Sequence, residues 1–153
     1  MGNRSFFILC ILALGLACNK QTTDVVEQKA PKPGIYFFED QYFVDMVDLA
    51  KRENKKVFVD FEADWCLPCK VMEEEIYSDA KVGDYFNRHF INFKVDIESE
   101  KGANIASVFN VYALPTLVFV DNNGSTIKRI EGSISYSELL ASAEEVLADQ
   151  VVE

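Results

Sequence analysis

The sequence of 153 residues predicts an α/β fold, a central mixed β-sheet flanked by helices on both faces. Apolar runs rich in Val, Ile and Phe are typical of buried strands, and segments with apolar residues at helical spacing lie between them. Near the end, the runs 116–120 and 125–130 are joined through Asn123-Gly124, a dipeptide that favours a hairpin. Strands that alternate with helices and then end in a hairpin and a helix predict a mixed sheet.

The first predicted elements surround a central strand. A short strand over 35–38 comes first, and a helix over 40–53 follows, with Asp40 as its N-cap. The apolar run 57–61 predicts the central strand, because it is short, continuous and rich in Val and Phe. The next segment, 66–76, has a proline in its first turn and predicts a helix.

The second half repeats the alternation. Ser78 is the predicted N-cap of a helix over 79–87. A strand over 90–96 and a helix over 102–109 come next. In this helix, the spacing of the apolar residues directs Val108 inward with Ile105 and Phe109. The remaining predicted elements are the two hairpin strands and a closing helix over 137–148.

Two cysteines that are two residues apart, Cys66 and Cys69, open the helix after the central strand. A cysteine at a helix N-terminus faces unpaired N–H groups and the positive end of the helix dipole, which both favour the thiolate that attacks disulfides. The second cysteine, about one turn on, is close enough to form a disulfide and to release a trapped partner. The spacing predicts a redox pair in which Cys66 attacks and Cys69 resolves.

Two other interpretations of the pair are a static disulfide and half of a zinc site. A structural zinc site needs four ligands, so two more cysteines or histidines would be required. After removal of a signal peptide, the chain offers only His89. We therefore expect no metal, and no cofactor apart from the redox-active Cys66–Cys69 disulfide itself.

The N-terminus carries an export signal. Residues 1–17 have one positive charge, a short apolar run and a small residue before Cys18, which predicts a signal peptide. The sequence before Cys18 resembles a bacterial lipoprotein signal, which implies a lipid anchor on Cys18; an ordinary cleaved signal is the alternative. Residues 18–34 are polar, contain two prolines and predict a flexible tether, so the domain covers 35–153. A formal net charge of −10 disfavours nucleic acid and anionic lipid as partners, leaving the anchor as the only membrane contact.

Four features, in order, resemble the thioredoxin family. They are the strand and approach over 59–66, the motif over 66–70, the tripeptide 114–116 and Gly132. The stretches 63–66 and 77–79 resemble the C-terminal thioredoxin-like domain of the bacterial thiol:disulfide interchange reductase and small exported thioredoxin-like lipoproteins. The resemblance implies a thioredoxin fold and a thiol–disulfide oxidoreductase.

The resemblance also implies roles for residues near the cysteines. Asp60 corresponds to a buried acid that moves protons for the second cysteine; bonding of its carboxyl to the backbone alone is the other interpretation. The family's lysine partner of that acid falls on Asn92, and Lys94, two residues on, is the expected substitute.

A second set of implied roles concerns substrate binding. The Leu114–Pro115 bond is cis in the family, and Leu114 pairs with the substrate backbone, with Thr116 beside it; a trans proline that starts a strand is the alternative. Trp65 gives an apolar contact beside the motif, or serves only in packing.

The direction of electron flow is suggested by acidic residues. Glu62 and Asp64 flank the motif, and nearby anions oppose a thiolate, which lowers the reduction potential. We therefore expect a monomeric reductase of disulfide-bearing client proteins that faces the periplasm, lipid-anchored or soluble, and takes electrons from a separate membrane donor. The alternatives are a disulfide oxidase or isomerase on the same fold, and a non-catalytic module that binds clients.

Overall fold

The computed structural model describes residues 33–148. The predicted signal peptide, Cys18 and all but the end of the predicted tether lie outside this range, so these predictions stay predictions. Within the range, no helix combines the length and the apolar character that are needed to cross a bilayer.

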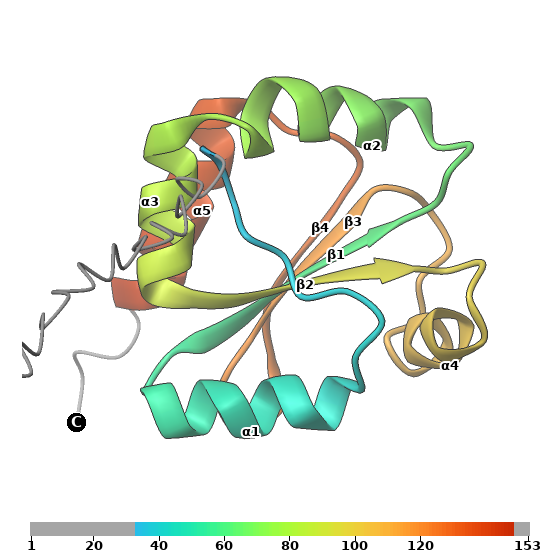
Figure 1. Ribbon diagram of the computed structural model, residues 1–153, viewed down its shortest axis with the longest axis horizontal. Coiled ribbons are helices and arrows are strands. Elements are labelled where there is room, and N and C mark those ends of the chain that lie inside the picture. The colour runs from blue at the N-terminus through green and yellow to red at the C-terminus, as the bar shows by residue number, and fades with distance from the viewer. Residues whose placement is uncertain (1–32, 149–153) are drawn as a thin grey trace, which may run out of the picture. The chain divides into compact units, whose positions relative to one another are not determined.

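The sheet has four strands in the order β2-β1-β3-β4 (Figure 1). Strand β1 (Lys56–Glu62) pairs in parallel with β2 (Phe90–Asp96) on one side. On its other side it pairs antiparallel with β3 (Thr116–Val120), which continues into β4 (Thr126–Glu131) through the predicted hairpin. The predicted mixed sheet is confirmed, although in the hairpin turn only Gly124, and not Asn123, has a positive φ.

Helices cover both faces of the sheet, as predicted (Figure 1). Each face has its own hydrophobic cluster, because side chains alternate between the two faces along every strand. One face is covered by α2 (Leu67–Met72), its continuation η1 (Glu73–Tyr77), α3 (Ala80–His89) and α5 (Tyr136–Ala148), and the other by α1 (Phe43–Glu53) and α4 (Glu100–Val108).

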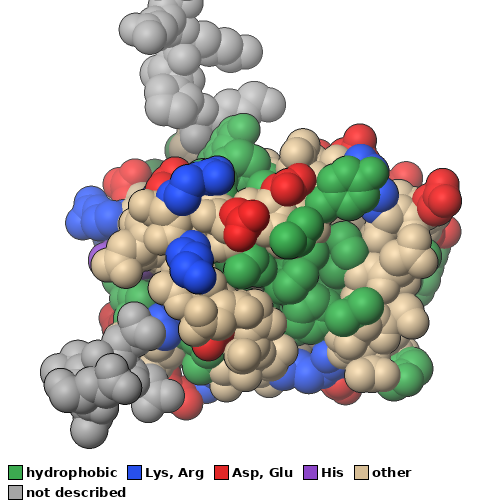
Figure 2. All heavy atoms as spheres, turned by 90° about the horizontal axis from the view of Figure 1, so that it is seen from below, with side chains coloured by type: hydrophobic (Ala, Val, Ile, Leu, Met, Phe, Trp, Pro, Cys, Tyr) green, Lys and Arg blue, Asp and Glu red, His purple; other side chains and the backbone are tan. Residues whose placement is uncertain are grey.

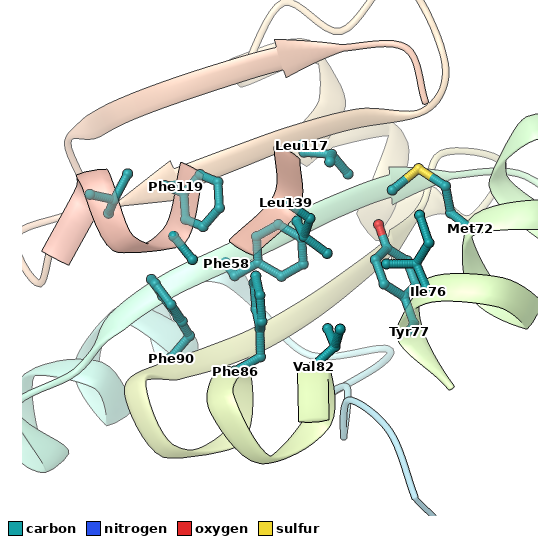
Figure 3. Close-up of a cluster of buried hydrophobic side chains, with 12 residues drawn as sticks. Phe58, Met72, Ile76, Tyr77, Val82, Phe86, Phe90, Leu117, Phe119 and Leu139 are labelled. Carbon is teal, nitrogen blue, oxygen red and sulfur yellow. The ribbon is translucent and has the colours of Figure 1, made fainter. Parts of the chain in front are cut away.

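The alternation along β1 determines where its one buried acid points. Val57 and Val59 belong to the cluster beneath α1 and α4, whereas Phe58 lies in the opposite cluster, shown in Figure 3, with its ring centroid 4.9 Å from that of Phe86. Asp60 follows Phe58 by two residues and therefore points to the same side of the sheet. This is the side on which the helix after the cysteines lies.

The predicted strand over 35–38 is not formed. Only Phe38 exchanges backbone hydrogen bonds with β2, in an isolated bridge to Phe93. The rest of the segment bonds elsewhere: the Ile35 N–H donates to the carbonyl of Tyr77 at 2.7 Å, and Gly34 accepts from the side chain of Asn87 at 3.0 Å. We call residues 34–38 the N-terminal strap, because they fasten the end of η1, α3 and the edge of β2 together.

Two predicted helix caps are wrong by one or two residues. Asp40 has a φ of 52°, and Tyr42 occupies the N-cap position of α1 without a side-chain hydrogen bond. Asp79, not Ser78, caps α3, since its carboxylate accepts the N–H groups of the next turn at 2.8 and 3.1 Å. The Ser78 hydroxyl instead donates to the carbonyl of Glu74 at 2.6 Å and closes the preceding helix.

The predicted start and inward face of α4 also need correction. Its N-cap is Ser99, whose hydroxyl accepts the Gly102 N–H at 2.9 Å, so the helix begins before residue 102. Val108 is 76% exposed rather than buried. Together with Val44 on α1, it lies on the surface, and hydrophobic side chains gather in the middle of the face seen from the α1 side (Figure 2).

The predicted single helix over 66–76 changes its geometry midway. An α-helical part ends at Met72, and the π-helical η1 follows. Two successive residues of η1, Ile76 and Tyr77, lie in the core with Met72.

Candidate active site

The cysteine pair lies where β1 passes into α2. Cys66 is the N-cap of α2, and its sulfur accepts a hydrogen bond from the backbone N–H of Cys69 at 3.2 Å. The two sulfurs form a disulfide, with the Cα atoms 5.3 Å apart. A donor that points at the Cys66 sulfur also stabilises negative charge on that sulfur after reduction. The pair is shielded, since Cys66 is 2% and Cys69 is 5% exposed.

An apolar rim borders this shielded pair. Trp65 is 67% exposed and Leu67 is 70% exposed, on either side of Cys66 in the chain. Val71, one turn further along α2, is also on the surface. Trp65 therefore does not serve in core packing, which was the alternative interpretation of this residue. The rim offers contact area to a client without rearrangement of the core.

The loop before β3 lies at the same edge of the sheet as the cysteines. Thr116 pairs with Phe61 across the antiparallel β1–β3 ladder, so the start of β3 meets the end of β1. The Leu114–Pro115 peptide bond is cis, as the resemblance implied, and the Pro115 carbonyl accepts the Gly132 N–H at 2.8 Å. Thr116 is fully buried, and its hydroxyl donates to the carbonyl of Ala113 at 2.8 Å, so its side chain holds the loop rather than facing a client.

Asp60 is buried beneath Cys69 and is only 2% exposed. Burial opposes the charged carboxylate and raises its pKa from 3.8 to about 7, and the negative charges of Glu62 and Glu73 act in the same direction. The Lys94 ammonium opposes this increase in the pKa. A carboxyl with a pKa near 7 exchanges protons readily at neutral pH, which suits a general base.

Lys94 occupies the position expected of the acid's cationic partner. It pairs directly with Asp60 in the parallel β1–β2 register, so the two side chains share one face of the sheet. Its ammonium forms an ion pair with Glu73 and lies 4.7 Å from the centre of the Phe37 ring, which belongs to the strap. By contrast, Asn92, at which the resemblance placed the lysine partner, donates from its side-chain amide to the carbonyl of Tyr36 at 3.2 Å.

A small cavity lies between Asp60 and Cys69. It has a volume of about 80 Å³ and is lined by Asp60, Glu62, Cys69, Lys70, Glu73 and Lys94. Its polar walls and size admit water, which needs two to four polar partners. A proton can therefore pass between the Cys69 sulfur and the Asp60 carboxyl without crossing apolar core.

Sequence reasoning missed two residues of this site, Glu73 and Tyr77. Glu73 follows Cys69 by four residues, so its place on the same helical face could have been found from spacing alone. Tyr77 lay beyond the predicted end of this helix at residue 76, so its place at the site was not predicted. In the structure η1 extends to Tyr77, and the Tyr77 ring lies in the core.

Comparison with known proteins agrees with this geometry. Residues 43–147 match the family model of a thioredoxin-like domain. The chain is 32% identical over 104 residues to the thiol:disulfide interchange protein DsbD of Tatumella citrea, a match that covers 66% of this chain but 18% of that protein.

Solved structures show the same fold. A candidate disulphide isomerase from Bacteroides thetaiotaomicron is 36% identical, with a TM-score of 0.67 over 77% of this chain and 97% of that one. The oxidised C-terminal domain of DsbD from Neisseria meningitidis, at 21% identity, shares the fold with a TM-score of 0.57 over 67% of this chain and 90% of that one. With its Cys66–Cys69 pair at the start of α2, the chain belongs to the family of thioredoxin-like thiol–disulfide oxidoreductases.

Proposed function

We propose that this protein reduces disulfide bonds of client proteins in the bacterial envelope. The observation that carries the proposal is the different setting of the two sulfurs. The Cys66 sulfur, at the start of α2, accepts a hydrogen bond from the Cys69 N–H, whereas Cys69 shares a small cavity with the buried Asp60. The helix terminus favours a thiolate on the first sulfur, and the acid accepts a proton from the second. The two cysteines therefore have different chemical environments that match attack and resolution.

The reaction begins with the reduced protein. The Cys66 thiolate attacks one sulfur of a client disulfide, a new Cys66–client bond forms, and the other client sulfur leaves as a thiolate. Cys69 then gives its proton to Asp60 and attacks the Cys66 sulfur. The Cys66–Cys69 disulfide forms, the client leaves with both sulfurs reduced, and two electrons have passed to it. A separate electron donor must reduce the protein before the next cycle.

Client binding involves the apolar rim and the loop before β3. Trp65 and Leu67 are exposed beside the shielded sulfurs, and the start of β3 lies at the same edge of the sheet. An extended client segment pairs with the backbone of Leu114, and its apolar side chains contact Trp65. Pro115 has no N–H, so it presents no competing donor at this point.

The reducing direction follows from the charges around the pair. Glu62 is partly buried, and this burial raises its pKa. The Lys94 ammonium acts in the opposite direction and lowers it. The negative charge of Glu62, with those of Asp64 and Glu73, opposes a thiolate and thus lowers the reduction potential of the pair. The protein is proposed to work in the envelope as a monomer, anchored through a lipid on Cys18, on the strength of residues 1–18. Fatty-acid labelling that is the same in the wild type and in Cys18→Ala would refute the anchor alone.

A trapping experiment tests the proposed roles. Cys69→Ser removes the resolving thiol, so it should accumulate mixed disulfides with client proteins that disappear on addition of dithiothreitol, whereas Cys66→Ser should trap few. Equal trapping by both variants would show that the roles are assigned wrongly.

A catalysis assay completes the test. The wild type should accelerate the reduction of insulin by dithiothreitol, and both single variants should lose this activity. A protein that binds clients without any acceleration would be the non-catalytic module instead. A protein that instead rearranges scrambled disulfides faster than it reduces insulin would be an isomerase. The similar protein from Bacteroides thetaiotaomicron is a candidate for that activity.

A further inference from the structure

Two buried polar atoms beside the proposed site have no hydrogen-bond partner of normal geometry among the described residues. They are the hydroxyl of Tyr77 and Oδ1 of Asp60, a donor and an acceptor. A third such atom, the side-chain oxygen of Asn92, lies beyond the site. A buried polar atom without a partner costs about 1–3 kcal/mol, so a donor and an acceptor that are both left without one beside the same site point to a contact with each other.

The fold brings these two atoms together from different elements. Asp60 points from β1 toward the side of the sheet that α2 and η1 cover. Tyr77 lies at the end of η1, 2% exposed, and Figure 3 shows its hydroxyl oxygen directed toward the sheet. The ring is fixed by edge-to-face contacts with Phe37 and Phe58, whose centroids are 5.2 and 6.4 Å away.

The two groups also affect each other electrostatically. The Tyr77 hydroxyl acts on the Asp60 carboxyl and lowers its pKa, though by less than burial raises it. Burial, followed by the charge of Asp60, raises the pKa of Tyr77 well above its usual value, so the phenol keeps its proton at every physiological pH. A group that stays protonated beside a carboxylate can only donate to it.

We propose that the Tyr77 hydroxyl is the hydrogen-bond donor that holds the Asp60 carboxylate, and so sets the pH at which Asp60 accepts the proton of Cys69. This inference rests on the proposed function. Tyr77 is a positioning residue, because it acts through Asp60 and never exchanges its own proton. Its effect is to keep a deeply buried base ionised at neutral pH, where resolution of the mixed disulfide needs it.

Other charged groups face Asp60 and remain in place when the hydroxyl is removed. They are Glu62 on β1, Lys70 on α2, Glu73 on η1 and Lys94 on β2, and the residue opposite Asp60 on β3 is the apolar Leu117. None of these residues hydrogen-bonds to Tyr77 in the described part of the chain. Tyr77→Phe therefore removes one donor, keeps the ring contacts and leaves the charge around Asp60 unchanged.

The first arm of the test is a carboxyl titration by NMR on the oxidised full chain labelled at aspartate, with Asp60→Asn to assign the signal. Loss of a hydrogen bond to a charged group should move the Asp60 midpoint upward in Tyr77→Phe by about one pH unit or more. Tyr85→Phe, which removes a hydroxyl from neighbouring α3, is the matched control and should leave the midpoint unchanged. An unchanged midpoint in Tyr77→Phe would overturn the proposal.

The second arm measures resolution. The reduced full chain is mixed with a symmetric aromatic disulfide whose free thiolate is coloured. Attack by Cys66 releases one equivalent of the thiolate and leaves a mixed disulfide, and the second equivalent, released when Cys69 attacks the Cys66 sulfur, is followed against pH. The profile of this second release in Tyr77→Phe should lie at higher pH than that of the wild type and Tyr85→Phe, with about fivefold slower release at pH 7 for a shift of one unit from a midpoint of about 7. In the Asp60→Asn background, Tyr77→Phe should have no further effect.

The two arms separate the two proposals. A wild type that never releases the second equivalent of the coloured thiolate would contradict the proposed function, whatever Tyr77 does. A wild type that releases it, with an identical pH profile in Tyr77→Phe, would contradict only the role of Tyr77.

Discussion

At the residue scale, Asp60 is a buried carboxyl whose pKa lies near neutral pH. Burial raises its pKa to about 7, and Lys94 and Tyr77 limit that increase from two sides. The buried acid was predicted here from the resemblance to the thioredoxin family, and the structure adds that Asp60 lies on the same side of the sheet as Phe58. The resemblance also led to the prediction of Lys94, which lies on the same face two positions from the expected one.

A raised carboxyl pKa implies a cost in stability that depends on pH. In the unfolded chain Asp60 has its ordinary pKa of 3.8, whereas in the folded chain burial raises its pKa to about 7. The penalty is therefore absent below pH 4, grows between pH 4 and 7, and is complete above pH 7. Oxidised Asp60→Asn should consequently exceed the wild type in free energy of unfolding by about 2–4 kcal/mol at pH 8 and by little at pH 4.

Denaturant unfolding at several pH values measures this difference. Asp84→Asn, on the exposed face of α3, is the matched control, and its difference from the wild type should not change with pH. If the difference in free energy of unfolding between Asp60→Asn and the wild type is likewise independent of pH, the pKa of Asp60 is not raised by folding, and Asp60 is not suited to act as a base at neutral pH.

At the scale of elements, the N-terminal strap packs against two side chains of the site. Its Phe37 ring contacts both the Lys94 ammonium and the Tyr77 ring, so it helps to fix the two groups that limit the pKa of Asp60. The strap itself is fastened where Gly34 passes over α3. A Cβ atom on Gly83 would lie 2.2 Å from the carbonyl carbon of Gly34, which leaves no room for any side chain.

This close approach reverses the usual effect of a helical glycine. Gly→Ala within a helix normally stabilises a protein by about 1 kcal/mol. Here Gly83→Ala must displace the backbone of the strap, so we expect the free energy of unfolding to fall by about 1–3 kcal/mol. Thermal unfolding measures the effect, and Asn104→Ala on the exposed face of α4 serves as control, with a small gain in stability expected. Stabilisation by Gly83→Ala would mean that the strap does not pack against α3.

The strap and η1 also show where prediction from sequence ended. Strands and helices with a clear apolar period, such as 57–61 and 90–96, were predicted because burial alone determines their pattern. The strap has the composition of a strand, but apart from the bridge at Phe38 its hydrogen bonds go to a helix end and to asparagine side chains that only the folded chain brings near. The predicted helix over 66–76 ended one residue before Tyr77, which is why Tyr77 was not expected at the site.

At the scale of the whole molecule, charge and topology give the redox pair its setting. The chain has a formal net charge of −10, and several of its acids lie near the sulfurs. The parallel β1–β2 pair and the antiparallel β1–β3 pair bring the cysteines, Asp60 with Lys94 and the loop before β3 to one end of the sheet. Residues that are far apart in sequence thus form one site, as the thioredoxin fold implied.

The reduction potential of the Cys66–Cys69 pair tests the central claim most directly. Equilibration of the full chain with glutathione or dithiothreitol buffers should give a value nearer to about −270 mV, typical of thioredoxin, than to about −120 mV, typical of a strong oxidant. Glu62→Gln with Asp64→Asn should move it upward, because the thiolate loses two opposing charges, whereas Glu144→Gln on α5 should not. A wild-type potential more oxidising than about −180 mV would contradict the reductase and favour an oxidase or isomerase.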